Sequence, residues 1–242
     1  MPKHQLLDNV SHKDLRIITE HKPEYGDTAS YTAVFVSELR DVQGHYPVFF
    51  RKNSETAQFE AIALFGFAEQ ENLYLDDMGW HASYIPLTIQ RRPFLIGTQN
   101  VNADGIVTQQ TVVHVDMNSP RISSSEGEGE AVFLPQGGQS PFLQGISSVL
   151  KTIDEGHQQT RAFIDVLLAN DLIEAVNIKV QLDNGSQNEL GGLYTLNEEK
   201  VAGLSGDTLM SLHQQGYVQH IHMILASMSN MTALIEKKNK QL

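Results

Sequence analysis

The alternation of hydrophobic and polar positions in the first half of the chain predicts short strands. The apolar runs on either side of the polar turn NSET predict a β-hairpin over residues 46–67, with one well-buried arm. The segments LRIIT, NLYLD, FLIGT and TVVHVDM are further strand candidates, with the polar loop NVNADG between the last two. In residues 31–42 the apolar side chains instead recur at the spacing of one helix face, which predicts a helix.

Residues 76–94, DDMGWHASYIPLTIQRRPF, combine a turn, the only tryptophan of the chain and a short helical pattern. DDMG is a turn signal, in which Gly79 suits a positive φ. The run IPLTIQRR is expected to form a short amphipathic helix, because Pro86 suits a first helical turn and Pro93 stops a helix. The pattern therefore predicts a strand–turn–helix corner around Trp80.

From residue 141 onward the hydrophobic pattern is mainly helical. PFLQGISSVLKTIDEGHQQTRAFIDVLLAN carries one apolar stripe along its length and predicts a long helix. The segment NIKVQLDNGSQNELGGLYTL predicts a hairpin at about 176–196 with an Asn-Gly corner. Two or three helices are expected after it: one begins at the Asn197 cap, one ends at Gly216, and one spans about 217–236.

Taken together, these elements predict an α+β fold, with mainly antiparallel β-sheet in the N-terminal half and helices plus a β-hairpin in the C-terminal half. Residues 117–140 are rich in Ser, Gly and Glu, so we expect an exposed loop there that separates a β-rich part, 1–116, from a helical part, 141–242. The two parts could also form one compact domain.

Composition and charge narrow the function classes. With 40% hydrophobic and 19% charged residues the chain resembles an ordinary soluble globule, and no window approaches the roughly 18 apolar residues that span a bilayer. The start, MPKHQLLDNVSHKD, lacks the apolar core of a secretory signal, so a cytoplasmic protein without membrane insertion is expected. The net charge of −12 argues against nucleic acid and anionic membranes as partners, because both are negatively charged. The absence of cysteine excludes disulfides and thiolate chemistry.

The order of landmarks along the chain resembles the SapC family, which is named from an S-layer-associated gene and is distinct from the transporter permeases of the same name. The residues that carry the resemblance are SELRDVQGHYPVFF, ENLYLDDMGWHASYIPLTIQRRPF, VDMNSP, QSPFLQ, GGLYTLNEEKVAGL and ASMSNMTAL, in this order. The resemblance implies a soluble Gram-negative bacterial protein, whose gene neighbours include outer-membrane receptors and flavin halogenase-like enzymes. It implies no particular active site, and at the position of His114 family members more often carry another residue before the matching aspartate.

One candidate ligand-binding site combines aromatic and cationic side chains. Aromatic residues of the corner could line a pocket, and the paired arginines could hold an anionic or carboxylate ligand as planar hydrogen-bond donors. The alternative is a structural corner, in which the indole N–H bonds to the backbone and the arginines pair with local carboxylates. The candidate residues are Trp80, His81, Tyr84, Arg91 and Arg92, with Asp116 as a possible polar partner.

His114-Val115-Asp116 is the strongest metal pattern in the sequence. On a strand, residues i and i+2 face the same side, so His114 and Asp116 could bind one ion. A distant histidine such as His213, His220 or His222 would complete a two-His, one-carboxylate site for Fe(II). The alternative is a strand end in which Asp116 caps the following turn and His114 faces water. We expect no cofactor, with Fe(II) as the alternative.

Motifs for nucleophilic or nucleotide-dependent catalysis are missing from the sequence, which contains no G-x-S-x-G elbow and no GxxxxGK[ST] loop. Glu38 and His45, near the end of the first expected helix, are a weaker acid–base pair. Helix-surface charge and stabilisation of the helix C-terminus by its dipole explain these two residues more simply. The sequence therefore favours a protein that binds without catalysing a reaction.

Three hypotheses follow. The favoured one is a SapC-like accessory protein that binds a small molecule, peptide or protein partner in a surface-associated uptake or modification pathway. The second is a non-haem Fe(II) oxygenase-like enzyme that uses His114, Asp116 and a helix histidine. The third is a structural or assembly protein, a homo-oligomer whose last helix places Met223, Met228 and Met231 at a dimer seam, although core packing also explains these methionines.

Overall fold

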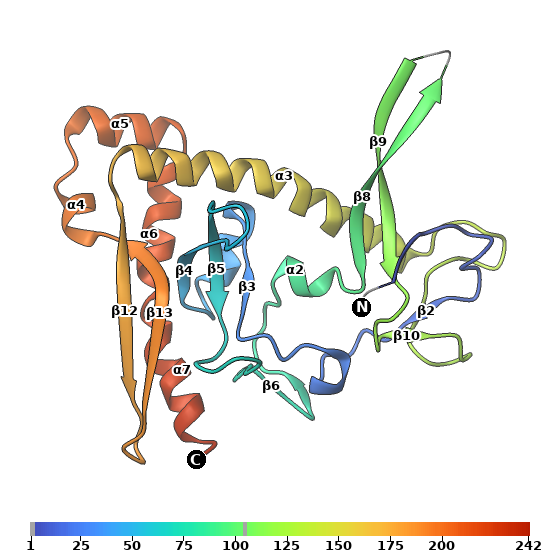
Figure 1. The fold of residues 1–242 in the computed structure, drawn as a ribbon, viewed down its shortest axis with the longest axis horizontal. Coiled ribbons are helices and arrows are strands. Elements are labelled where there is room, and N and C mark those ends of the chain that lie inside the picture. Colours follow the sequence, from blue (N-terminus) through green and yellow to red (C-terminus); the bar gives the residue numbers. More distant parts are fainter. Residues whose placement is uncertain (1–2, 104–105) are drawn as a thin grey trace. The chain divides into compact units, whose positions relative to one another are not determined.

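The chain folds into antiparallel sheets and helices, so the predicted α+β class is confirmed (Figure 1). The computed structural model describes residues 3–103 and 106–242, with the backbone alone at 100–103 and 106–108. The chain divides into two compact units, each built from two segments. Unit 1 comprises Met1–Asp27 and Leu87–Asp154, and unit 2 comprises Thr28–Pro86 and Glu155–Leu242. The sequence predicted a division into residues 1–116 and 141–242, separated by the segment 117–140. These boundaries differ from those of the two units, and that division stays a prediction.

Unit 1 contains two small antiparallel sheets, with strand orders β1-β9-β8 and β10-β2-β11. Strands β8 and β9 continue beyond β1 as a two-stranded ribbon (Figure 1). The strands of unit 1 are β1 His4–Leu6, β2 Arg16–Ile17, β8 Phe94–Ala103, β9 Ile106–Asp116, β10 Ile122–Ser123 and β11 Glu130–Ala131. Its helices are η1 Pro23–Tyr25, α2 Leu87–Gln90 and, up to Asp154, α3 Pro141–Ala169.

The strands predicted at FLIGT and TVVHVDM are confirmed as parts of β8 and β9, which are longer than the hydrophobic pattern suggested. Residues 100–103 of the predicted loop NVNADG continue β8, because the ladder extends to Ala103 opposite Ile106. The last two residues of that loop lie outside the described residues. Thr98 and Gln99, both exposed, pair with polar residues of β9, and such a ladder shows no alternation that a pattern could detect.

Residues 117–140 were expected to be an exposed loop, and this is wrong for part of the segment. Strands β10 and β11 pair with the two edges of β2, and Arg121, Val132 and Phe133 are buried. Gly129 has a φ of +67°, and a Cβ at this position would lie 2.3 Å from the carbonyl oxygen of Ile17. The glycine content that suggested a loop therefore allows this segment to approach β2 closely.

The apolar core of unit 1 joins the two sheets to the first turns of α3. The helix predicted from residue 141 is confirmed, and its N-terminus is capped by Ser140, whose hydroxyl accepts the N–H of Leu143 at 3.2 Å. The short helix predicted at 85–92 is confirmed as α2, which ends before Pro93. The core residues are Leu15, Ile17, Phe94, Val115, Val132, Phe133, Leu143, Ile146 and Leu150.

Unit 2 is built on a five-stranded antiparallel sheet of order β12-β13-β4-β5-β3, against which α6 packs at β4 and β13 (Figure 1). A small hairpin of β6 and β7 forms the predicted turn at DDMG, with Gly79 at a φ of +128°. The strands are β3 Tyr31–Ala33, β4 Val48–Lys52, β5 Phe59–Leu64, β6 Leu75–Asp76, β7 Gly79–Trp80, β12 Ile173–Gln181 and β13 Gln187–Leu196. The helices are η2 Val36–Glu38, α1 Leu39–Val42, α4 Glu198–Ala202, α5 Gly206–Gln214, α6 Tyr217–Ser227, α7 Asn230–Asn239 and the second half of α3.

Both predicted hairpins of unit 2 are confirmed, as β4 with β5 and as β12 with β13. The predicted cap of α4 is also confirmed, since the Asn197 side chain accepts the N–H of Lys200 at 2.8 Å. The helix predicted over 31–42 is wrong. Residues 31–33 instead pair with β5, and helical structure is confined to η2 and α1. Tertiary pairing with β5 overrides the helical spacing of the apolar residues there.

The helix predicted over 217–236 is in fact two helices, α6 and α7. The break follows Ser227, whose buried hydroxyl donates to the carbonyl of Ile224 at 2.6 Å and accepts the N–H of Val48 at 3.0 Å. These bonds fix the end of α6 to β4, a tertiary contact that helical periodicity does not encode. Within the described ranges, no helix is long and apolar enough to cross a membrane.

Candidate functional site

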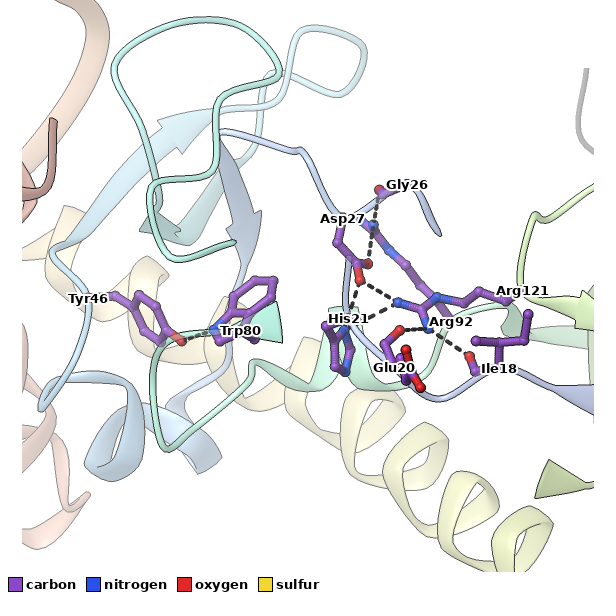
Figure 2. Close-up of polar contacts among 9 residues, drawn as sticks. All are labelled: Ile18, Glu20, His21, Gly26, Asp27, Tyr46, Trp80, Arg92 and Arg121. Carbon is purple, nitrogen blue, oxygen red and sulfur yellow. Dashed lines mark hydrogen bonds and ion pairs between the residues drawn. The ribbon is translucent and has the colours of Figure 1, made fainter. Parts of the chain in front are cut away.

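The polar centre of unit 1 is a buried pair of opposite charges, Asp27 and Arg121 (Figure 2). Their side chains are 0% and 2% exposed, and Nη2 of Arg121 donates to Oδ2 of Asp27. His21 contacts the same carboxylate oxygen through Nδ1 at 2.9 Å. Nη1 of Arg121 donates to the carbonyl oxygens of Ile18 and Glu20, each at 2.8 Å. The guanidinium group therefore ties the chain that follows β2, at Ile18 and Glu20, to Asp27 just after η1.

Arg92 adds a second cation to this centre (Figure 2). Its Nη1 donates to the carbonyl of Gly26 at 2.9 Å and lies 3.6 Å from Oδ1 of Asp27. The Arg92 side chain is 31% exposed, whereas that of Arg121 is buried. Burial lowers the pKa of both guanidinium groups, and the attraction of Asp27 opposes that shift. Two guanidinium groups thus meet one carboxylate, which leaves this part of an acidic protein with excess positive charge.

One donor of Arg121 is not used. Among the described residues, its buried Nε has no hydrogen-bond partner. Buried N–H groups of native proteins are rarely left without an acceptor, because the lost hydration costs about 1–3 kcal/mol. The described protein groups therefore leave this N–H of Arg121 without an acceptor.

Arg92 and Arg121 are both among the residues that line a pocket of about 390 Å³ in unit 1. Its volume lies in the range of small-molecule sites, and most of its wall is apolar. The pocket is formed by the end of β2 and the two residues after it, the end of α2 and Arg92, Arg121 just before β10, and the first turns of α3. Its lining comprises Ile17, Ile18, Thr19, Gln90, Arg92, Arg121, Pro141, Phe142, Gly145, Ile146 and Val149.

The Trp80 corner lies in unit 2 and is a chain of hydrogen bonds among aromatic side chains. The indole Nε1 donates to the hydroxyl of Tyr46 at 2.8 Å, as drawn in Figure 2, and that hydroxyl donates to the carbonyl of Tyr84. The hydroxyl of Tyr84 in turn donates to Oε2 of Glu38 at 2.7 Å. The indole also packs edge-on against Phe65, with ring centroids 5.2 Å apart. The indole N–H and both tyrosine hydroxyls are thus occupied within unit 2.

The remaining candidate residues have local partners. His81 forms an exposed ion pair with Asp76 at 2.7 Å, and Nη1 of Arg91 donates to the carbonyl of Phe94 at 2.7 Å. Asp116 accepts the N–H of Lys3 at 2.8 Å and that of Asn118 at 3.0 Å, so it caps the end of β9.

The structure divides the six candidates between the units. Trp80, His81 and Tyr84 lie in unit 2, whereas Arg91, Arg92 and Asp116 lie in unit 1. Of the three in unit 1, Arg92 lines the pocket described above. The common site that all six residues were expected to form stays a prediction.

The residues proposed to bind Fe(II) form no recognisable centre in the described part of the chain, where no group of three or more His, Asp or Glu side chains could hold a metal. The imidazole of His114 lies against Gly97 of the paired strand, where an added Cβ would be 2.0 Å from Nδ1. His213 is exposed and belongs to unit 2. His222 is exposed, whereas His220 packs against Phe163 with centroids 5.7 Å apart, and burial lowers the pKa of His220.

Sequence reasoning missed Arg121 and Asp27, and it explained Glu38 wrongly. Glu38 was interpreted as a helix-surface charge, but it is 2% exposed and also accepts the N–H of Phe35 at 3.1 Å. A signal for Arg121 was present, since it is the only Lys or Arg between Arg92 and Lys151. A lone guanidinium in a long uncharged or acidic stretch needs a specific partner, but that partner lies 94 residues away.

Comparison with known protein families gives a match over most of the chain. The model of the family described as SapC matches residues 7–234, nearly the whole chain. No curated protein and no solved structure matches the chain.

Proposed function

This chain belongs to the SapC family, and on that premise we propose that it is an accessory protein that binds an anionic small molecule or an anionic group of a peptide or protein partner, without catalysing a reaction. The partner would belong to a surface-associated uptake or modification pathway, as the family resemblance implies. A cytoplasmic location, expected from the sequence, is part of the same proposal.

The observation that supports this proposal is the pocket of unit 1, whose wall contains Arg92 and the buried Arg121. A guanidinium group presents planar, paired donors that match carboxylate and phosphate oxygens. Asp27 neutralises one of the two cations, so an anion in the pocket would complete the charge balance. The net charge of −12 would repel anions elsewhere on the surface, which makes a local cationic pocket the favourable place to hold one.

A thermal-shift screen of anionic and neutral metabolites and peptides tests this proposal. We expect anionic compounds to raise the unfolding midpoint of the wild type, because a ligand that binds the folded state stabilises it. Arg92→Gln should weaken their binding roughly tenfold to a hundredfold, the effect of losing a charged hydrogen bond. Arg91→Gln is the matched control, since Arg91 is adjacent but bonds to the carbonyl of Phe94 and does not line the pocket.

A screen in which neutral and anionic compounds act alike, or in which both arginine variants bind equally well, would contradict the proposal. Each variant is first compared with the wild type by circular dichroism, so that a loss of binding is not confused with a loss of fold.

Assembly through the last helices is a second candidate function, because two of the three predicted methionines line a groove. Met228 and Met231 lie with Ile235 in a groove of about 700 Å³ beside β12, whereas Met223 is buried at 8% exposure. Light scattering of the wild type and of Met231→Glu tests this role. A dimer that Met231→Glu converts to a monomer would support it, and a monomeric wild type would exclude it.

The Fe(II) alternative has a direct test. Elemental analysis of protein purified without a metal-affinity tag would support it if stoichiometric iron were found and then lost in His114→Ala. Iron absent from the wild type would remove it.

A further inference from the structure

We infer that the pocket of unit 1 binds a small monocarboxylic acid with an apolar body, the carboxylate at Arg92 and the first turn of α3 and the apolar part along α3 beside Gly145. This inference rests on the proposed function and names the ligand class for the same site. Four independent features of the pocket lead to it.

The charge balance favours a monoanion. Arg92 and Arg121 carry two positive charges, and Asp27 supplies one negative charge, so one positive charge is left over. Removing an uncompensated charge from water is costly, and a ligand with one negative charge would offset that cost. A phosphate monoester carries nearly two negative charges at neutral pH and would leave an excess of the opposite sign.

The accessible hydrogen-bond donor of this site is the guanidinium group of Arg92. The Arg92 side chain lines the pocket and is 31% exposed, whereas that of Arg121 is 2% exposed and is bonded to Asp27. The fork of a guanidinium group fits the two oxygens of a carboxylate. These donors therefore favour a carboxylate over a neutral polar group.

The start of α3 adds to the positive potential. Ser140 caps the helix: its hydroxyl accepts the N–H of Leu143 at 3.2 Å, and its carbonyl oxygen accepts the N–H of Gln144 at 3.0 Å. The N–H of Phe142 is among the first four of the helix, which have no acceptor within the helix, and Phe142 lines the pocket. The N-terminal end of a helix carries a partial positive charge, so an anion is favoured there.

The size and the walls of the pocket limit the rest of the ligand. A volume of about 390 Å³ equals roughly a dozen water molecules in the liquid, so a ligand of about a dozen non-hydrogen atoms would fit. Phe142, Ile146 and Val149 provide an apolar wall along one side of α3. Gly145 lies on the same wall, and a Cβ added there would meet no atom within 4 Å, so the missing side chain leaves open space beside the helix.

Calorimetric titration with 3-phenylpropanoate, its neutral amide and phenyl phosphate tests the ligand class, with octanoate as a probe of different shape. We expect at least one of the two acids to bind with a stoichiometry of one per chain. The amide and phenyl phosphate should each bind at least tenfold more weakly than that acid, because neither matches a single uncompensated positive charge.

The variant Gly145→Leu tests the position of the apolar body. The new side chain should fill the space beside α3 and weaken binding of the acid at least tenfold. Ser148→Leu is the matched control, because Ser148 is exposed on the same helix and does not line the pocket. It should bind the acid like the wild type, and the unfolding midpoints of both variants show whether they fold.

The possible outcomes separate this inference from the broader proposal. If neither acid binds but other anions bind in an Arg92-dependent manner, the ligand class is wrong and the proposed function stands. Equal affinity for acid and amide, or full affinity in a folded Gly145→Leu variant, would also overturn the inference. If no anion of any class binds, both the inference and the proposed function are wrong.

Discussion

Unit 1 and unit 2 each bury a carboxylate, and the two units satisfy it in different ways. Asp27 of unit 1 is surrounded by cations, with Arg121 bonded to it and Arg92 nearby. Glu38 of unit 2 accepts hydrogen bonds from neutral groups, the N–H of Phe35 and the hydroxyl of Tyr84. Both arrangements stabilise their unit, but two cations surround the single carboxylate of Asp27, whereas the groups that donate to Glu38 are neutral. That difference distinguishes a site able to take a ligand from a purely structural network.

The pocket of unit 1 strengthens this contrast. Its wall includes both cations, whereas the indole N–H of Trp80 and the hydroxyl of Tyr46 are committed to each other in unit 2. An aromatic cluster beside charged residues is therefore not sufficient to indicate recognition. What matters is whether the polar atoms have partners within the protein.

The largest effect is expected from Arg121→Leu. This change leaves the buried Asp27 without the cation bonded to it, so we expect the free energy of unfolding to fall by about 3–5 kcal/mol. Urea denaturation measures this loss. The control is Arg161→Leu in unit 2, where Arg161 is exposed. A loss no larger than that of the control would show that the buried pair is not the centre of unit 1.

An alkaline pH should affect the tyrosine network of unit 2 next most strongly. Burial raises the pKa of Tyr46 and Tyr74 above the ordinary value of 10.0. The unfolded chain therefore loses these protons first, so the stability from the neutral hydroxyls is fully present below pH 10 and is lost as pH rises through the folded-state pKa.

Above pH 10 the free energy of unfolding should fall by up to about 1.4 kcal/mol per pH unit for each such tyrosine. Urea unfolding between about pH 9 and 11 measures this pH dependence. Tyr46→Phe should make the fall with pH less steep by the contribution of one tyrosine. An unchanged slope in Tyr46→Phe would mean that this hydroxyl is not held neutral by burial.

Gly145→Ala should have a smaller and opposite effect. A Cβ at this position meets nothing within 4 Å, and alanine has the higher helix propensity, so we expect stability to increase by about 0.5–1 kcal/mol. The unfolding midpoint in a thermal melt measures the change. A lower midpoint would show that the space beside α3 is not open, which would count against the pocket.

The smallest effect is expected from His81→Ala. His81 and Asp76 form an exposed pair, and such pairs contribute little because water competes for both partners. The unfolding midpoint and the affinity for 3-phenylpropanoate should both equal those of the wild type. A clear loss of affinity would indicate that the ligand binds at the Trp80 corner, and would contradict the assignment of a ligand site to unit 1 and a structural network to unit 2.

Local elements were predictable from the sequence because their signals are local. The hairpin of β4 and β5 follows from two apolar runs around NSET, and the start of α4 follows from the Asn197 cap. The helix predicted over 31–42 failed because residues 31–33 pair with a strand about thirty residues later, and pairing of this kind is not visible in a window of a dozen residues.

Of the three charged residues at the centre of unit 1, only Arg92 was predicted from the sequence. Arg92 was found because arginine pairs suggest anion recognition, but its partners Asp27 and Arg121 come from distant segments that meet only in the folded chain. Arg121 also lies in a segment whose composition suggested an exposed loop. Trp80 attracted attention as the only tryptophan, yet its N–H is bonded to Tyr46, whose position in the sequence gave no sign of the contact.

The most direct test of the account is a titration of isotope-labelled protein with 3-phenylpropanoate, in which the backbone amide signals are followed by NMR. We expect saturable shifts at Arg92, Phe142 and Gly145, with the indole N–H signal of Trp80 unchanged. Saturable shifts centred on Trp80 and Tyr84, with the signals of Phe142 and Gly145 unmoved, would contradict it.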